Sequence, residues 1–192
     1  NYLGIFNLAL MVLYFSKKVI DYAQMKLLFK AILLPLISTL VLITVRSPDF
    51  SDAKFTLGAS FDMAGGYASN QVSTVLGLGF FLLAIMYLFN DKIFKYRFLD
   101  LGLMGYFIFR GLLTFSRGGV MVPIFALIVM YFILSNASTR QIKNMGLRKI
   151  NLNVVLPILI GGFIVWSITD QLTGGMLTLR YRGETAGTLA GT

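Results

Sequence analysis

The sequence predicts an all-α fold, a polytopic bundle of transmembrane helices, and three observations support this. Of its 192 residues, 57% are hydrophobic and only 13% are charged, whereas soluble domains are about 45–50% apolar and about 25% charged. The apolar residues form continuous runs without the alternation of a half-buried strand. The basic residues stand in the short gaps between these runs. Because lipid admits only helices or closed barrels as spanning elements, the runs are predicted to be helices.

Six spans are expected in one transmembrane domain that covers residues 1–192. Some runs are shorter than the ~20 residues that cross a bilayer core, and flanking residues are expected to complete them. The first run begins at the start of the chain and resembles the end of a helix, and the fourth is interrupted by Arg110. The predicted spans lie near 3–15, 27–45, 71–89, 101–115, 120–134 and 152–168.

The basic residues predict which way the spans face. Counted along the chain, the successive connections hold 4, 2, 3, 1, 4 and 2 Lys and Arg residues. Basic residues concentrate in cytoplasmic loops, so the connections 16–30, 90–100 and 136–151 are predicted to be cytoplasmic. The loops 46–70 and 169–192 then face outward, together with the turn near Arg117. Topology therefore explains most of the net charge of +9, and no nucleic-acid partner is expected.

Missing residue types exclude several kinds of chemistry within this sequence. It contains no Cys and no His, so it offers no disulfide, no thiolate or imidazole metal ligand and no His general base. Neither a GxxxxGK[ST] nor a GxGxxG phosphate-binding motif is present. The predicted spans lack the buried carboxylates of a proton or sodium relay. No metal and no cofactor are therefore expected.

Arginines on the outward side are the strongest functional signal. Arg110, Thr114 and Arg117 are spaced i, i+4 and i+7, so they share one face if the helix continues to Arg117. Gly118 and Gly119 follow and leave room for a ligand. Guanidinium groups bind phosphate oxygens in a bidentate manner, which predicts an anion site. The alternatives are that Arg110 extends its side chain to the membrane interface and that Arg117 merely occupies a tight turn.

The tail carries a second basic cluster on the same predicted side. Its residues 179–185 include Arg180, Arg182 and Glu184. The two arginines could complete the anion site from the outward loop. The alternative is a solvated loop with a local Arg–Glu pair.

Three stretches resemble the O-antigen ligase/polymerase family of bacterial inner-membrane proteins. The turn 114–119, of sequence TFSRGG, resembles a turn between two spans that recurs in that family. The stretch 65–73, with Asn70, is similar to a motif that opens the span after an outward loop, and 179–185 is similar to the start of the large periplasmic loop. The resemblance covers roughly residue 60 to the end.

This resemblance implies a metal-independent glycosyltransferase of the bacterial inner membrane whose active face is periplasmic. Its donor would be an oligosaccharide on undecaprenyl pyrophosphate, and its acceptor the lipid A core, another glycan or a protein. The expected catalytic residues are Arg117 and a second arginine of the large loop, which is Arg180, Arg182 or a residue past Thr192. The expected pyrophosphate-binding residues are Arg110, Thr114, Ser116, Gly118, Gly119 and Asn70.

Two departures from the family pattern lead to a further expectation. Ligases of this family use a periplasmic His, which this sequence lacks, and the family has more spans than six. The sequence is therefore expected to be an internal fragment of a longer protein that does not catalyse alone. Two other hypotheses stay open, a transporter or channel for an anion and a non-catalytic assembly protein.

Overall fold

A computed structural model describes residues 2–16, 18, 20–49, 55–89, 91–136, 138 and 152–182. Within these ranges all regular secondary structure is helical and no strand occurs, as the sequence predicts. The helices are α1 (Tyr2–Ser16), α2 (Tyr22–Arg46), α3 (Ser69–Leu88), α4 (Arg97–Leu113), α5 (Arg117–Asn136), α7 (Leu152–Leu172) and α8 (Met176–Arg182).

The prediction of six spans is corrected to four. Among the described residues, only four helices are long and apolar enough to cross a membrane, namely α2, α3, α5 and α7. Helix α1 has 15 residues. Helix α4 has 17 residues and carries charged Arg97 and Asp100 in its first turn. At 1.5 Å per residue α4 is about 26 Å long, which is less than the ~30 Å of a bilayer core. The helix ends at Leu113 because the chain turns at Thr114, within the predicted span 101–115.

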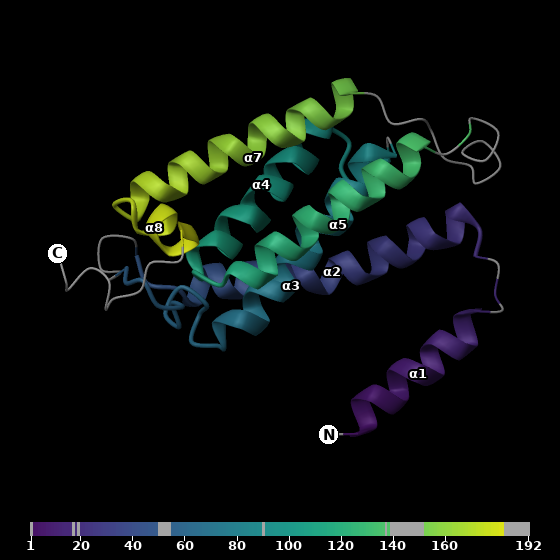
Figure 1. Cartoon of the computed structure of the whole chain (residues 1–192), viewed down its shortest axis with the longest axis horizontal. Helices are drawn as coiled ribbons and strands as arrows, with labels where there is room; N and C mark the ends of the chain where they lie inside the picture. Colours follow the sequence, from purple (N-terminus) through teal and green to yellow (C-terminus); the bar gives the residue numbers. More distant parts are fainter. Residues whose placement is uncertain are drawn as a thin grey trace.

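Helix α3 is the centre of the bundle. It packs against α5, α4 and α2, and α4 packs in turn against α7. Its buried side chains, such as Leu76, Phe80 and Leu83, form the core with Phe107 of α4. Helix α1 stands apart from the other helices (Figure 1), and its described side chains are exposed.

Glycines allow α3 to approach its neighbours. A Cβ on Gly79 would lie 2.4 Å from the Phe107 ring, and one on Gly77 would lie 1.9 Å from the carbonyl oxygen of Gly119. Small residues at helix interfaces allow such close backbone contact in membrane proteins. The two glycines therefore determine how closely α4 and α5 pack on α3.

The connections gather at two opposite ends of the bundle (Figure 1). The connections 114–116 and 173–175 and the described parts of the connection 47–68, which are 47–49 and 55–68, lie at one end, which we call the arginine end. The connection between α3 and α4, described at 89 and 91–96, lies at the other, which we call the lysine end. This arrangement agrees with the predicted alternation of the connections. The assignment of the arginine end to the outer face of a membrane stays a prediction.

Candidate anion site

The turn between α4 and α5 interrupts the helix that the sequence suggested. Helix α4 ends at Leu113 and α5 begins at Arg117. Phe115 has a φ of 55°, a left-handed conformation that few non-glycine residues adopt. The expectation that Arg110, Thr114 and Arg117 share one helix face is therefore wrong, because Arg110 and Arg117 belong to different helices.

Hydrogen bonds within the turn hold this conformation. The hydroxyl of Thr114 donates to the carbonyl of Gly111 at 2.7 Å and accepts from the N–H of Ser116 at 3.3 Å. The ring of Phe115 is buried and stacks on Phe55 at a centroid distance of 5.8 Å. Thr114 is fully buried and thus shapes the turn rather than facing a ligand.

Polar contacts fix the turn to the start of α3. The Ser73 hydroxyl donates to the carbonyl of Ser116 at 3.0 Å, and the Ser116 hydroxyl donates to the amide oxygen of Asn70 at 2.9 Å. A Cβ on Gly119 would lie 2.0 Å from Oγ of Ser73, whereas one on Gly118 would meet open space. Gly119 is therefore required for packing against α3, and Gly118 leaves the adjacent space free.

A cavity of about 700 Å³ opens beside this turn. Six of the predicted site residues line its polar end, namely Asn70, Ser116, Arg117, Gly118, Gly119 and Arg180. Arg117 and Arg180 are 63 residues apart in the sequence, and the fold brings them to one cavity. The remaining wall is formed mostly by apolar residues, namely Thr74, Leu78 and Phe81 of α3 and Val122, Pro123 and Ala126 of α5. The cavity thus joins two cationic side chains to an apolar groove.

Helix α8 carries Arg180 back toward the bundle. The chain reverses at Gly174 and Gly175, whose φ angles of 62° and 80° suit glycine. A carboxylate oxygen of Asp170 then accepts a hydrogen bond from the N–H of Thr178 at 2.8 Å. The side chain of Leu177 is buried, so α8 is docked on the bundle.

The two arginines of α8 differ in position. Arg180 is half-buried and lines the cavity. Arg182 is exposed and is absent from the cavity lining. Arg180 is therefore the arginine of α8 that is positioned to meet a ligand together with Arg117. Gly183, Glu184 and Thr185 of the predicted tail cluster lie outside the described residues.

Tyr181 lies near both arginines of the cavity. Its ring meets Trp166 edge-on at a centroid distance of 4.8 Å. Burial raises the pKa of Tyr181 to about 12, and the positive charges of Arg117 and Arg180 oppose this rise. A phenol with this pKa stays protonated at neutral pH, so the positive charge at the site is not offset by Tyr181.

Among the residues that the structure describes, Arg117 and Arg180 have no carboxylate partner. Within the described part of the chain the only ion pair joins Lys26 and Asp91, at the lysine end. The buried Nε of Arg180 and the buried hydroxyl of Tyr181 have no hydrogen-bond partner there, and the same holds for the buried Nε of Arg110 outside the cavity. The anion site is therefore inferred from the pair of arginines that line the cavity. No group of three or more His, Cys, Asp or Glu residues that could hold a metal occurs in the described ranges.

Arg110 lies away from this cavity and has protein partners. Its side chain is only 3% exposed and donates to the carbonyls of Ile43 at 3.1 Å and Met63 at 3.3 Å. It also donates to the hydroxyl of Ser47. Arg110 thereby ties α4 to the end of α2 and to the connection 47–68, and it neither extends to an interface nor lines the cavity.

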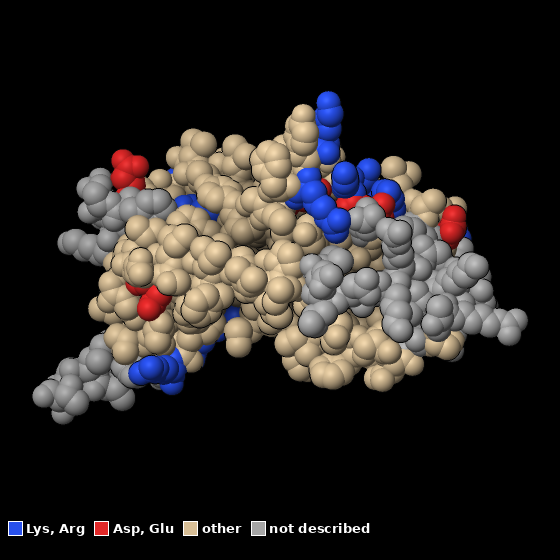
Figure 2. Space-filling model, turned by 90° about the horizontal axis from the view of Figure 1, so that it is seen from above, with Lys and Arg blue, Asp and Glu red and all other residues tan. Residues whose placement is uncertain are grey.

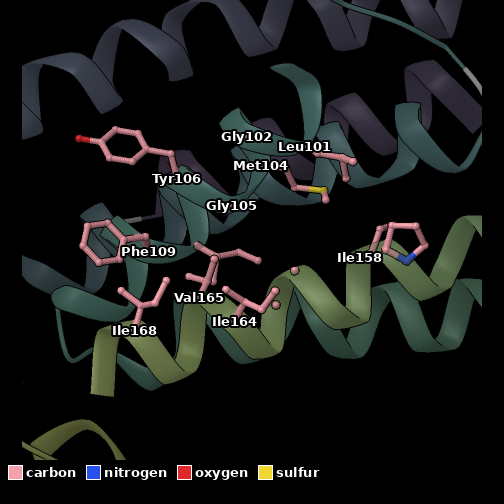
Figure 3. A pocket seen from close by; sticks show the side chains of 14 residues that line it. Leu101, Gly102, Met104, Gly105, Tyr106, Phe109, Ile158, Ile164, Val165 and Ile168 are labelled. Carbon is pink, nitrogen blue, oxygen red and sulfur yellow. The ribbon is translucent and has the colours of Figure 1, made fainter. Parts of the chain in front are cut away.

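A groove on the outside of α4 and α7 provides a contrast. It has a volume of about 420 Å³ and is lined by glycines and apolar side chains, among them Gly105, Ile164 and Val165 (Figure 3). Tyr106 carries its only side-chain hydroxyl. This groove has no charged residue, so it lacks what an anionic ligand requires.

Sequence reasoning missed the residues that hold the site in place. Ser73, Trp166 and Tyr181 position the turn and α8. Ser73 and Tyr181 lie within the stretches 65–73 and 179–185 that carry the family resemblance, but no role was expected for either, and Trp166 lies in neither stretch. Comparisons with protein-family models, with curated proteins and with solved structures find no match for this chain.

Proposed function

We propose that the cavity between α3, α5 and α8 binds the pyrophosphate of a lipid-linked glycan through Arg117 and Arg180. The protein would then transfer the glycan from an undecaprenyl-pyrophosphate carrier to an acceptor glycan or lipid A core on the periplasmic face of a bacterial inner membrane. The observation that carries this proposal is the meeting of two arginines, without carboxylate partners among the described residues, in a cavity whose remaining wall is mostly apolar.

The shape of the cavity supports a lipid-linked anion over a free one. Asn70, Thr74, Leu78 and Phe81 follow one another along α3 from its first turn. At 1.5 Å per residue they span about 16 Å and change from polar to apolar. A pyrophosphate with an isoprenoid tail matches this arrangement, because its charged group would lie beside the arginines and its hydrocarbon chain along the apolar residues. The volume of about 700 Å³ falls in the usual range of ligand pockets.

The charges suit the chemistry of this transfer. The acceptor oxygen forms a bond to the anomeric carbon as the bond from that carbon to the pyrophosphate oxygen breaks, so negative charge grows on the leaving pyrophosphate. The proton of the acceptor hydroxyl is taken up by the departing pyrophosphate. Fixed cationic donors stabilise charge that develops in a transition state. Arg117 and Arg180 would supply such donors, and guanidinium groups stay charged at working pH.

An assay of the complete protein in proteoliposomes tests the proposal. Supplied with undecaprenyl-pyrophosphate-linked oligosaccharide and an acceptor, the Arg117→Ala variant should lose transfer while still inserting into the membrane. Arg182→Ala is the matched control, since Arg182 is exposed and absent from the cavity lining. Transfer retained by Arg117→Ala would overturn the assignment.

The same preparation separates the alternative functions. Uptake of an anion into the vesicles, without transfer, would indicate a transporter. Products of a single transfer would indicate a ligase, and a ladder of glycan lengths a polymerase. Tolerance of Arg117→Ala in both assays would indicate a non-catalytic assembly protein.

A further inference from the structure

The connection at the lysine end combines exposed lysines with exposed aromatic rings. Residues 91–98 read Asp-Lys-Ile-Phe-Lys-Tyr-Arg-Phe. Lys92 and Lys95 are exposed, and they alternate with Phe94, Tyr96 and Phe98, which are 39%, 53% and 67% exposed. Lys and Arg side chains gather on the face of the molecule that Figure 2 presents, with acidic side chains beside them.

The acidic residues of this segment and its surroundings are already engaged. Asp91 forms an ion pair with Lys26 of α2. Asp100 is buried and accepts hydrogen bonds from the N–H groups of Phe94 at 3.1 Å and Ile93 at 3.4 Å. These carboxylates therefore fix the connection to α2 and α4.

Arg97 also has a structural partner. It donates to the carbonyl of Tyr87 at 3.0 Å, and its guanidinium lies 4.2 Å from the centre of the Tyr87 ring. Lys92 and Lys95 differ from Arg97, because neither has a carboxylate partner within the described residues. Lys95 lies 5.7 Å from the centre of the Tyr96 ring, and this ring is itself exposed. Their charges are thus available on a connection that other contacts hold in place.

This pattern matches the headgroup region of a bilayer. Aromatic side chains are enriched at the membrane–water interface, and lysines near the surface attract anionic lipids. A zwitterionic headgroup would also need a partner for its own cation, and the nearby carboxylates Asp91 and Asp100 are occupied. We propose that Lys92 and Lys95, flanked by Phe94 and Tyr96, bind the phosphate of an anionic lipid headgroup at the lysine end.

The proposal goes beyond the topological role of basic residues, which depends only on their number near a span. A binding site depends on position and should therefore give selectivity for a lipid. It is also independent of the anion site at the arginine end, which lies at the opposite end of the bundle (Figure 1).

Lipid selectivity in vesicles of defined composition tests this inference. The complete protein is reconstituted in mixed phosphatidylcholine and phosphatidylglycerol, and the lipids retained after detergent extraction are quantified. The double variant Lys92→Gln/Lys95→Gln should lose about tenfold in its preference for phosphatidylglycerol. The variant Lys92→Arg/Lys95→Arg should retain the preference, because it keeps both charges.

A matched control and a competition decide between explanations. Lys18→Gln removes one exposed lysine whose ammonium contacts Tyr14 rather than a carboxylate, and it should leave the preference unchanged. An unchanged preference in the double variant, or an equal loss in Lys18→Gln, would overturn the proposal. Displacement of phosphatidylglycerol by millimolar inorganic phosphate would also overturn it, by showing that the residues bind the free ion.

Discussion

Arg110 and Arg117 are seven residues apart in the sequence, yet they serve different regions of the molecule. Arg110 lies near the end of α4, buried, with backbone carbonyls and a serine hydroxyl as partners. Arg117 begins α5, is exposed, and lines the cavity with Arg180. The turn 114–116 separates them.

This comparison shows how a structural arginine differs from a ligand-binding one in the partners of its guanidinium group. A buried guanidinium whose hydrogen bonds are used by the protein stabilises the fold. One that faces a cavity without a carboxylate retains its charge for a ligand. The predictions below test this division, from the largest expected effect to the smallest.

Gly119→Ala should cause the largest loss of stability near the site. Its Cβ would lie 2.0 Å from Oγ of Ser73 and 2.3 Å from the Ser73 backbone carbon, so α5 and α3 must separate. Overpacking costs about 1–3 kcal/mol where side chains can adjust, and we expect more than about 3 kcal/mol because backbone is involved. Gly118→Ala is the control, since its Cβ meets open space. Equal melting temperatures of the two variants would contradict the packing described.

Arg110→Met should cause the second largest loss of stability. It removes three donated hydrogen bonds between α4, α2 and the connection 47–68, and hydrogen bonds to charged groups contribute about 1.5–3 kcal/mol each at most. Because Ser47 still donates to Ile43 and Met63, we expect a net loss on the order of 3 kcal/mol. Thermal unfolding in detergent measures it. Arg46→Met removes an exposed arginine as the control, and a loss no greater than that of Arg46→Met would show that Arg110 is not structural.

Arg180→Gln and Arg182→Gln form a matched pair on one helix. The first should weaken binding of inorganic pyrophosphate about tenfold, because a charge-assisted hydrogen bond is lost. The second should change it less than about twofold, since an exposed charge outside the cavity is screened by salt. Titration calorimetry of the complete protein compares them. Equal effects would show that the cavity does not determine which arginine binds.

The smallest expected effect is the pH dependence of stability that arises from Tyr181. The folded protein favours the protonated form of this residue. Its pKa is raised from 10.0 to about 12, so the unfolded chain loses this proton first as the pH rises. The resulting stability is complete below pH 10 and is lost as the pH rises toward 12. Ultraviolet titration should show a tyrosine component near pH 12 that disappears in Tyr181→Phe. The same late component in the variant would contradict the burial of this hydroxyl.

The sequence predicts the helical class and the grouping of key residues. Continuous apolar runs predict helices, and the spacing of basic residues predicts which connections share an end. The family resemblance pointed to Asn70, Arg117 and either Arg180 or Arg182. Of these, Asn70, Arg117 and Arg180 line one cavity.

Other features depend on contacts that residue types do not encode. The chain breaks after α4 because Phe115 has a positive φ. Glycine and proline are the residues that usually indicate such a break in a sequence, and neither occurs at 114–116. Arg110 binds the carbonyls of Ile43 and Met63, and every residue has a carbonyl, so the sequence does not point to these partners. The number of spans was wrong because an apolar run does not by itself indicate where a helix ends.

The most direct test of the division between the two arginines measures stability and ligand binding on one variant, Arg117→Gln. The complete protein carrying it should bind inorganic pyrophosphate at least about tenfold more weakly while its melting temperature stays that of the unmodified protein. Pyrophosphate affinity that is unchanged, together with a lowered melting temperature, would show that Arg117 supports the fold as Arg110 does and would contradict the account.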